Sequence, residues 1–459
     1  MQQIWARQAL TPGGWQSGAL VTLGDDGLIV SVAANAPPPS AAEGVLHVGV
    51  LLPAPVNLHS HAFQRAMAGM TERRGPHAGD NFWTWRALMF RFLDQLGPDD
   101  VEAIAAFVQM EMLEAGYAAV AEFHYLHHQP GGMPYAALAE LSTRIAAAAD
   151  ETGIGLTLLP VLYQHGGCDG RPLGPGQIRF GNNPDQFARL VEGAEAALSH
   201  LPADARIGIA PHSLRAVSRD GLAFAARLAG DRPLHMHLAE QQAEVEDVQA
   251  TWGQRPAEWL LAHHDVGHNW CLIHATQMQP HETTALAATG AVAGLCPITE
   301  SNLGDGIFDG ARYLGAGGRF GIGSDSNVAI TLTGELRTLE YSQRLRDRAR
   351  AVLAAADAST GRVLFEGAVA GGAQAAGRIS GAIEAGRLAD LVALDADAVD
   401  LLGREGDAIL DSWIFASEAR IVTDVWAAGR HVVSQGRHRA RLRIEARYRK
   451  TILSLRERL

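Results

Sequence analysis

Short apolar runs alternate with longer Ala- and Leu-rich stretches through the middle of the chain, from about residue 52 to residue 370. The short runs are typical of buried strands, and the stretches at 101–115, 135–148 and 184–198 are typical of helices. Eight strand-like runs occur, at 55–58, 118–123, 155–162, 206–210, 233–237, 270–274, 291–296 and 319–323. Strands that alternate with helices pair in parallel, so the pattern predicts an α/β fold of the (β/α)8 barrel type with insertions. A doubly wound open sheet is the alternative, and polar residues at nearly every strand end favour the closed barrel.

The two ends of the chain carry a different pattern. Residues 1–51 contain short apolar runs broken by turn sequences at 24–27 and 37–39, and similar runs return at 388–394, 421–426 and 431–434. We therefore expect a barrel at 52–370, flanked by a small β-sandwich domain that combines 1–51 with 371–459. Residues 437–458 interleave arginines with Leu442, Ile444 and Leu455, which predicts a terminal helix with a solvated basic face.

Histidine or aspartate follows several of the predicted strands. A barrel of this type places its catalytic residues at the carboxyl ends of its strands. The residues at those ends are His59 and His61 on the first strand, His212 on the fourth, His235 and His237 on the fifth, His274 on the sixth and Asp325 on the eighth. One such histidine is usually structural, but four strands that end in histidine, together with an aspartate, predict a functional site.

The spacing of these residues favours a metal centre. Residues two apart in a strand project to the same side, so His59 and His61 can present two imidazole nitrogens to one ion. His237 and Asp325 would complete a set of three nitrogens and one oxygen, with a position left for water. Zn²⁺ is the expected ion, and Fe²⁺ or Mn²⁺ are the alternatives. Such a metal lowers the pKa of bound water towards neutrality.

Lysine is almost absent, which narrows the chemistry. Lys450 is the only lysine among the 38 Lys and Arg residues. A Schiff base with pyridoxal phosphate, a P-loop lysine and a carboxylated lysine that bridges two metals are all excluded. One metal ion is therefore expected, and arginine is left as the strong cation for an anionic substrate.

Hydrolysis at a carbon–nitrogen centre also needs groups that move protons. Glu240 follows His237 by three residues and enters the next loop, so its carboxyl group can reach the water. We expect Glu240 to shuttle a proton, Asp325 to act as the base towards the water, and His274 to polarise the attacked centre or orient the hydroxide.

Charge and cysteine content narrow the partners and the compartment. A formal net charge of −12 argues against general nucleic-acid binding. The scattered Cys168, Cys271 and Cys296 suggest neither a disulfide framework nor a cysteine zinc site, which favours a reducing cytoplasm. No apolar window approaches the length of a membrane span and no leader pattern opens the chain, so we expect a cytoplasmic protein without a membrane partner.

Several motifs together resemble a known family. They are His59-Ser60-His61, His237 with Glu240, His274, Gly323-Ser324-Asp325-Ser326 and the Gly-Arg-Leu-Ala-Asp-Leu-Val segment at 386–392. The combination, spread over nearly the whole chain, resembles the mononuclear aminohydrolases of the amidohydrolase superfamily. Within it, segments 57–67 and 296–306 resemble the formimidoylglutamate deiminases, although Ile298 stands where a smaller polar residue is expected.

The resemblance implies a reaction and a substrate. Formimidoylglutamate deiminases convert N-formimino-L-glutamate and water into N-formyl-L-glutamate and ammonia in histidine degradation, and a dicarboxylate of this kind calls for fixed cations beside the metal. The resemblance further implies a homodimer and a substrate-binding set of Gln64, Arg86, Tyr125, His212 and Arg215. A deaminase of a nucleobase or nucleoside is the alternative enzyme, in which the arginines would have no carboxylate partner. A catalytically silent barrel scaffold is a third possibility, and it predicts missing ligands, whereas all six metal and catalytic positions are filled.

Overall fold

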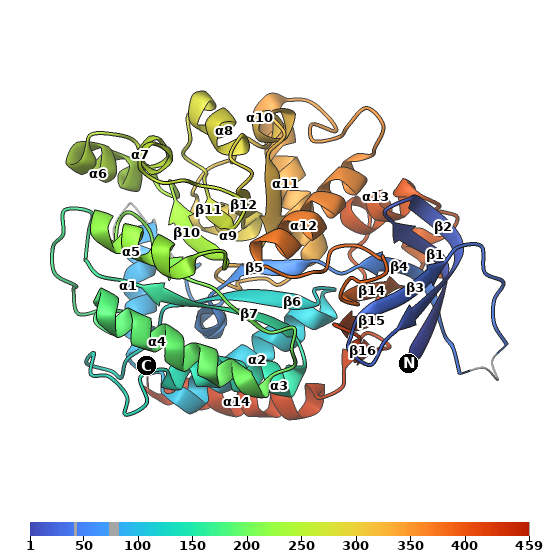
Figure 1. Cartoon of the computed structure of the whole chain (residues 1–459), viewed down its shortest axis with the longest axis horizontal. Coiled ribbons are helices and arrows are strands. Elements are labelled where there is room, and N and C mark those ends of the chain that lie inside the picture. The colour runs from blue at the N-terminus through green and yellow to red at the C-terminus, as the bar shows by residue number, and fades with distance from the viewer. Residues whose placement is uncertain (41–43, 73–81, 459) are drawn as a thin grey trace.

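The eight predicted strands form the central barrel of the computed structural model, which describes residues 1–40, 44–72 and 82–458 (Figure 1). The barrel strands are β5 (Val56–Ser60), β6 (Ala119–His124), β7 (Gly155–Leu162), β8 (Arg206–Ile207) with β9 (Ala210–Pro211), β10 (Leu234–Leu238), β11 (Trp270–His274), β12 (Val292–Leu295) and β13 (Arg319–Ile322). Every pairing between them is parallel. Their side chains are buried almost throughout, as expected for strands covered by helices.

Isolated parallel bridges close the barrel. The pairs Ile209–Leu234 and Ser213–His237 join the fourth strand to β10, and the pair Ser60–Asp325 joins the end of β13 to β5. The two sheets β5 to β9 and β10 to β13 therefore meet on both sides, which confirms the barrel-type fold and excludes the open sheet.

The predicted fourth strand, 206–210, is interrupted in the structure. β8 and β9 both pair with β7, whereas Ile209, one of the two residues between them, pairs with Leu234. Gly208 stands at this break, and a Cβ atom there would lie 2.7 Å from the carbonyl oxygen of Pro233. The close approach of the neighbouring strand explains why the ladder changes partner at a glycine.

Helices cover the outside of the barrel (Figure 1). They are α1 (Phe82–Leu93), α2 (Pro98–Glu114), α3 (Glu140–Thr152), α4 (Pro184–Ala197), α5 (Arg219–Ala229), α6 (Gln242–Trp252), α7 (Pro256–His263), α8 (Pro280–Ala287), α9 (Pro297–Leu303), α10 (Gly310–Gly315), α11 (Leu332–Asp347) and α12 (Thr360–Ala375). Capping side chains fix several starts: Asn183 and Ser218 accept hydrogen bonds from the third residue of α4 and of α5. The predicted helix at 135–148 begins later, at Glu140.

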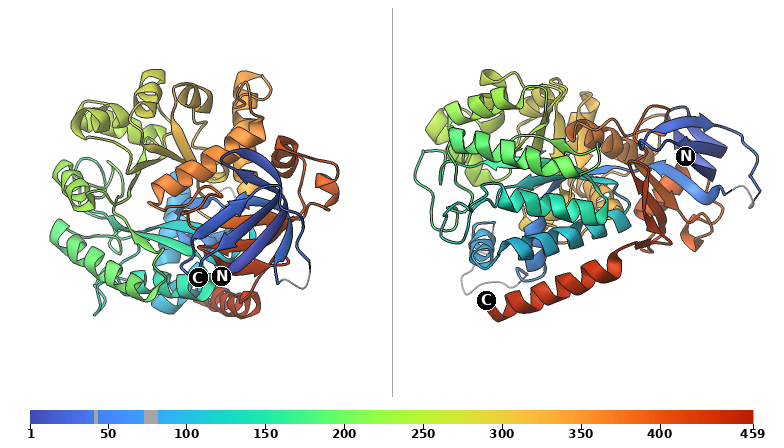
Figure 2. Two further views of the ribbon diagram at one scale, coloured as in Figure 1. Left: turned by 45° about the vertical axis from the view of Figure 1, so that its right-hand side comes forward. Right: turned by 60° about the horizontal axis from the view of Figure 1, so that its bottom comes forward.

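Both ends of the chain contribute to one eight-stranded sheet beside the barrel (Figures 1 and 2). Its strands are β1 (Gln2–Thr11), β2 (Gly14–Leu23), β3 (Ile29–Ala33), β4 (Leu46–Pro53), β14 (Leu391–Leu394), β15 (Val422–Ala427), β16 (Arg430–Ser434) and β17 (Arg437–His438), with α13 (Asp407–Phe415) inserted after β14. β4 joins the two halves, because it pairs in parallel with β1 and antiparallel with β14. The two-layer sandwich and the boundaries at 51 and 370 stay predictions.

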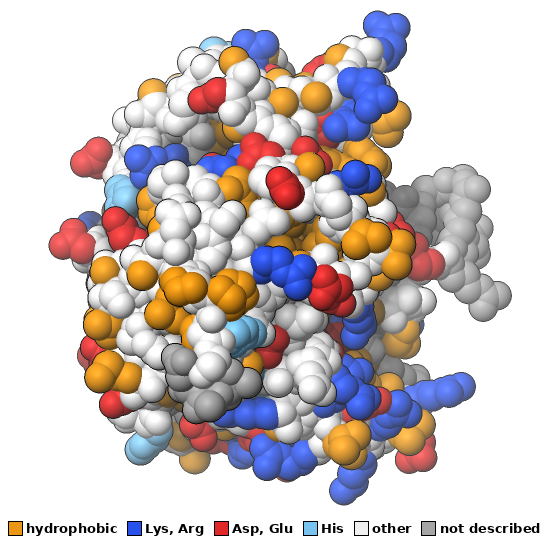
Figure 3. Space-filling view, turned by 90° about the vertical axis from the view of Figure 1, so that its right-hand side faces the viewer, with side chains coloured by type: hydrophobic (Ala, Val, Ile, Leu, Met, Phe, Trp, Pro, Cys, Tyr) orange, Lys and Arg blue, Asp and Glu red, His pale blue; other side chains and the backbone are white. Residues whose placement is uncertain are grey.

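The predicted terminal helix is α14 (Arg441–Arg458), which runs along α2 (Figure 2). Tyr448 stacks on Phe107 of α2, with ring centroids 3.9 Å apart. Some basic side chains of α14 pair with acidic ones, since Arg447 forms ion pairs with both Glu102 and Glu151. On the face in Figure 3, basic and acidic side chains are interspersed, with more basic ones near the lower edge. None of the helices in the described part of the chain could cross a membrane.

Candidate active site

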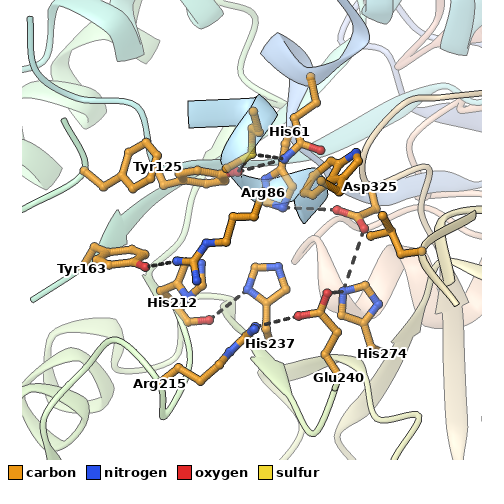
Figure 4. Close-up of a pocket in the computed structure, with 15 residues that line it drawn as sticks. His61, Arg86, Tyr125, Tyr163, His212, Arg215, His237, Glu240, His274 and Asp325 are labelled. Atoms are coloured by element: carbon orange, nitrogen blue, oxygen red, sulfur yellow. Dashed lines mark hydrogen bonds and ion pairs between the residues drawn. The ribbon is translucent and has the colours of Figure 1, made fainter. Parts of the chain in front are cut away.

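The predicted metal ligands converge at the carboxyl end of the barrel. Figure 4 shows three of them, His61, His237 and Asp325. His59 Nε2 lies 3.2 Å from His237 Nε2, and the Oδ1 atom of Asp325 lies 3.2 Å from His61 Nε2 and 3.4 Å from His59 Nε2. Ligand atoms of the three histidines all lie within 4.8 Å of one another, and the same holds for the set His59, His274 and Asp325. The structure thus brings together all four predicted ligands from strands far apart in the sequence.

Backbone carbonyls fix the orientation of two of these rings. His61 Nδ1 donates to the carbonyl of Phe123 at 2.9 Å, and His237 Nδ1 donates to the carbonyl of His212 at 3.0 Å. With the proton on Nδ1, each Nε2 directs a lone pair into the cluster. Burial lowers the pKa of His61 to about 3, and burial with neighbouring imidazoles lowers the pKa of His59 and His237. The Nε2 atoms of the buried His59 and His237 rings lie 3.2 Å apart, a spacing that fits two ligands of one divalent cation.

A hydrogen-bond network beneath the cluster holds Asp325 against β5. Asn57 Nδ2 donates to Ser324 Oγ at 2.7 Å, and the Ser324 amide donates back to Asn57 Oδ1 at 3.1 Å. Asn327 then donates to Ser60 Oγ at 3.1 Å, and the Asp325 amide donates to the carbonyl of His59 at 2.9 Å. Asp325 has a positive φ of 45°, a conformation that this network sustains.

His274 lies among carboxylates. Its Nδ1 is 3.3 Å from Glu300 Oε1, and its Nε2 is 3.8 Å from Glu240 Oε1 and 3.9 Å from Asp325 Oδ2. Burial alone would lower the pKa of His274, but Glu240, Glu300 and Asp325 outweigh it and raise the pKa to about 10. Burial raises the pKa of Asp325 to about 7. His274 can therefore hold a proton at the site while Asp325 can take one up near neutral pH.

Glu240 is paired with Arg215. Arg215 Nη2 donates to Glu240 Oε2 at 2.6 Å, and Arg215 Nε lies 3.6 Å from Glu244 Oε2. Burial would raise the pKa of Glu240, but Arg215 and His274 outweigh it, so the pKa lies below its ordinary value and the carboxylate is charged. Arg215, predicted only as a partner of the substrate, therefore also contacts a predicted catalytic group.

The remaining predicted residues line one pocket above this cluster, with about 510 Å³ of empty space including its open mouth (Figure 4). Gln64 Nε2 donates to Tyr125 Oη at 2.8 Å, and Arg86 Nη2 donates to Tyr163 Oη at 2.6 Å. Arg86 comes from α1, within the connection that follows β5, and His212 lies against the Tyr163 ring with centroids 4.6 Å apart.

The pocket also contains residues that the sequence did not single out. They are Trp85, Met89, Tyr163, Phe180 and Leu303. Tyr163 directly follows β7, so the strand-end rule could have found it. His235 is not among the lining residues: its Nε2 donates to the carbonyl of Ala375 at 2.7 Å, which makes it a structural histidine.

Comparisons with known proteins identify the family. The model of the Amidohydrolase family matches residues 50–432. The chain belongs to the amidohydrolase family. It is 48% identical over 441 residues to the curated formimidoylglutamate deiminase of Pseudomonas aeruginosa, covering 95% of this chain and 96% of that protein.

Two solved structures share the fold of this chain. A crystal structure of an amidohydrolase from Brucella melitensis has a TM-score of 0.95 with 49% identity, and covers 99% of this chain and 100% of that one. An adenosine deaminase from Xanthomonas campestris with bound zinc has a TM-score of 0.81 with 22% identity, and covers 99% of this chain and 98% of that one. At 22% identity, the comparison with the adenosine deaminase shows a shared fold only.

Proposed function

We propose that this amidohydrolase converts N-formimino-L-glutamate and water into N-formyl-L-glutamate and ammonia, a step of histidine degradation. The observation that carries the proposal is the meeting, in one pocket, of a ligand cluster with two arginines, Arg86 and Arg215. The cluster suits hydrolysis at a carbon–nitrogen bond, and the arginines suit a substrate with two carboxylates. The 48% identity to a curated formimidoylglutamate deiminase over nearly the whole chain supports the same reaction.

His59, His61, His237 and Asp325 would hold one divalent ion, because their donor atoms face one another in a buried cluster. Bound there, the ion would supply Lewis acidity that makes water nucleophilic near neutral pH. Zinc is the expected ion, because three imidazole nitrogens and one carboxylate oxygen suit it, and Fe²⁺ or Mn²⁺ are the alternatives.

The acid and base residues divide the proton transfers. Asp325 takes a proton from the attacking water as the new C–O bond forms at the formimino carbon. Glu240, whose charged carboxylate lies 3.8 Å from His274 Nε2, accepts the second proton of the same water and passes it to the departing nitrogen. The C–N bond then breaks, and with both water protons on the nitrogen the leaving group is ammonia. His274, which carries a proton because of the surrounding carboxylates, donates towards the attacked centre and stabilises the negative charge that develops there.

The substrate carboxylates are assigned to the cations and donors around the pocket. Arg86 and Tyr163 already share a hydrogen bond of 2.6 Å on one wall, and Arg215 lies on another. Gln64, Tyr125 and His212 add polar groups to the same pocket, which fits a linear molecule with a carboxylate at each end of its glutamate part.

The remaining features of the proposal concern the assembly and its surroundings. We propose that the chain divides into a barrel at 52–370 and a small domain formed by 1–51 with 371–459. We also propose a homodimer, which sedimentation of the purified chain tests. The three cysteines are unpaired, which suits a reducing cytoplasm.

A set of three substrates tests the proposed activity. We expect ammonia release from N-formimino-L-glutamate, a kcat/KM at least 100-fold lower for N-formiminoglycine, which has one carboxylate, and no release from adenosine. Equal rates with the two formimino compounds would remove the arginines from substrate recognition. Turnover of adenosine instead would favour the nucleoside deaminase.

A further inference from the structure

The peptide that carries Glu240 is held on every side. Ala239, the residue before it, has a positive φ of 48°. The carbonyl of Ala239 accepts from the Gln277 amide at 2.9 Å, and the carbonyl of Glu240 accepts from Thr276 Oγ1 at 2.7 Å. The next strand's loop thus binds the carbonyls of both residues, and their two amides remain to be satisfied.

One side chain, Glu244, binds both amides. Its Oε1 accepts from the Ala239 amide at 3.1 Å, and its Oε2 accepts from the Glu240 amide at 3.0 Å. Glu244 lies in the first turn of α6, where its charge is favoured by the helix dipole, and it is 1% exposed. Its Oε2 also lies 3.6 Å from Arg215 Nε. Because Arg215 pairs with Glu240, the carboxylate of Glu244 contacts both the backbone of Glu240 and the partner of its side chain.

We propose that Glu244 is a positioning residue, which holds the Glu240 carboxylate where it can move a proton to the departing nitrogen. This proposal rests on the role given to Glu240 in the proposed function. Without the Glu244 carboxylate, two buried amides lose their acceptor and the left-handed turn at Ala239 loses its main support. A shift of about 1 Å in a catalytic group can cost on the order of 100-fold in rate.

The chain contains a matched control, Glu340 of α11. Glu340 is 0% exposed, accepts from the amides of Val352 and Leu353 at 2.9 and 3.0 Å, and pairs with Arg344 at 2.6 Å. It therefore repeats the arrangement of Glu244, but it is not among the residues that line the pocket. If Glu244 were purely structural, its replacement by glutamine would change kcat no more than the same replacement of Glu340.

The experiment compares Glu244→Gln with Glu340→Gln in the full-length, zinc-loaded protein. We expect Glu244→Gln to lower kcat for N-formimino-L-glutamate about 10- to 100-fold while KM changes less than about threefold, because Arg215 keeps its contact with Glu240. Glu340→Gln should leave both constants unchanged. An unchanged kcat in Glu244→Gln, a change confined to KM, or an equal loss of kcat in both variants would overturn the proposal.

Hydrogen exchange provides a readout that does not depend on activity. Glutamine keeps one acceptor oxygen, so in Glu244→Gln at least one of the amides of Ala239 and Glu240 should exchange at least tenfold faster than in the parent. In Glu340→Gln the faster exchange should be confined to the amides of Val352 and Leu353. If the parent protein releases no ammonia, the proposed function fails, yet the exchange data still decide whether Glu244 holds this peptide. If Glu244→Gln does not fold, Glu244→Asp, which is too short to reach both amides, takes its place in both measurements.

Discussion

Replacement of Arg215 by methionine separates two roles of one buried cation. The side chain of Arg215 is 12% exposed, and it lies 2.6 Å from Glu240 and 3.6 Å from Glu244. Removal of the guanidinium takes an ion-pair partner from two buried carboxylates and leaves Glu240 with His274, at 3.8 Å, as its cation. Breaking a buried ion pair in this way costs about 3–5 kcal/mol of stability. Loss of a charged hydrogen bond to the substrate costs a further ~1.5–3 kcal/mol in binding, a fall in kcat/KM of roughly 10- to 150-fold.

The assay measures ammonia release and denaturant unfolding side by side. Arg378→Met is the matched control, because Arg378 is also buried between two carboxylates, Asp204 and Asp390, each at 3.0 Å. Arg378 is not among the described residues that line the pocket. The Arg378→Met variant should therefore lose comparable stability and keep the parent's kcat/KM. An Arg215→Met variant with the parent's kcat/KM would refute the assignment of Arg215 to the active site.

Three further substitutions test a predicted metal ligand, the hydrogen-bond network that supports Asp325, and a buried histidine outside the pocket. His61→Ala should remove the bound zinc, and elemental analysis that still finds the parent's zinc content would exclude His61 as a ligand. Asn57→Ala breaks the bonds to Ser324 and should weaken zinc affinity about 10- to 100-fold; competition with a chelator measures this, and unchanged affinity would contradict the supporting role. His438 Nδ1 accepts a hydrogen bond from the Ala440 amide, and burial lowers the pKa of this histidine. When the pH falls below the ordinary histidine pKa near 6.5, the unfolded chain therefore binds more protons than the folded one. Its contribution to stability is present above that pH and is lost as the pH falls, so the melting temperature of His438→Gln should fall less between pH 7 and pH 5 than the parent's; parallel curves would refute this.

The barrel and the ligand set could be predicted because both follow from local pattern. The runs at 155–162 and 270–274 coincide with β7 and β11, since short apolar runs are visible in the sequence. The histidines converge because parallel strands present their carboxyl ends to the same side. The family resemblance added the substrate, which spacing alone left open.

What could not be predicted depends on contacts between distant segments. Asn57 and Ser324 are 267 residues apart, and nothing in either local sequence marks them as partners. The division of the fourth strand follows from the packing of Gly208 against Pro233, which is a tertiary contact. Glu244 reads as an ordinary helix residue, and its role becomes visible only when its carboxylate is seen beside the amides of the preceding turn.

The most direct test of the central claim is the identity of the products in H₂¹⁸O. The zinc-loaded protein is incubated with N-formimino-L-glutamate, and the products are quantified by mass spectrometry and an ammonia assay. We predict one equivalent of ammonia and one of N-formyl-L-glutamate that carries a single ¹⁸O atom in its formyl group. Formation of formamide and glutamate, or the absence of ammonia, would contradict the proposed reaction.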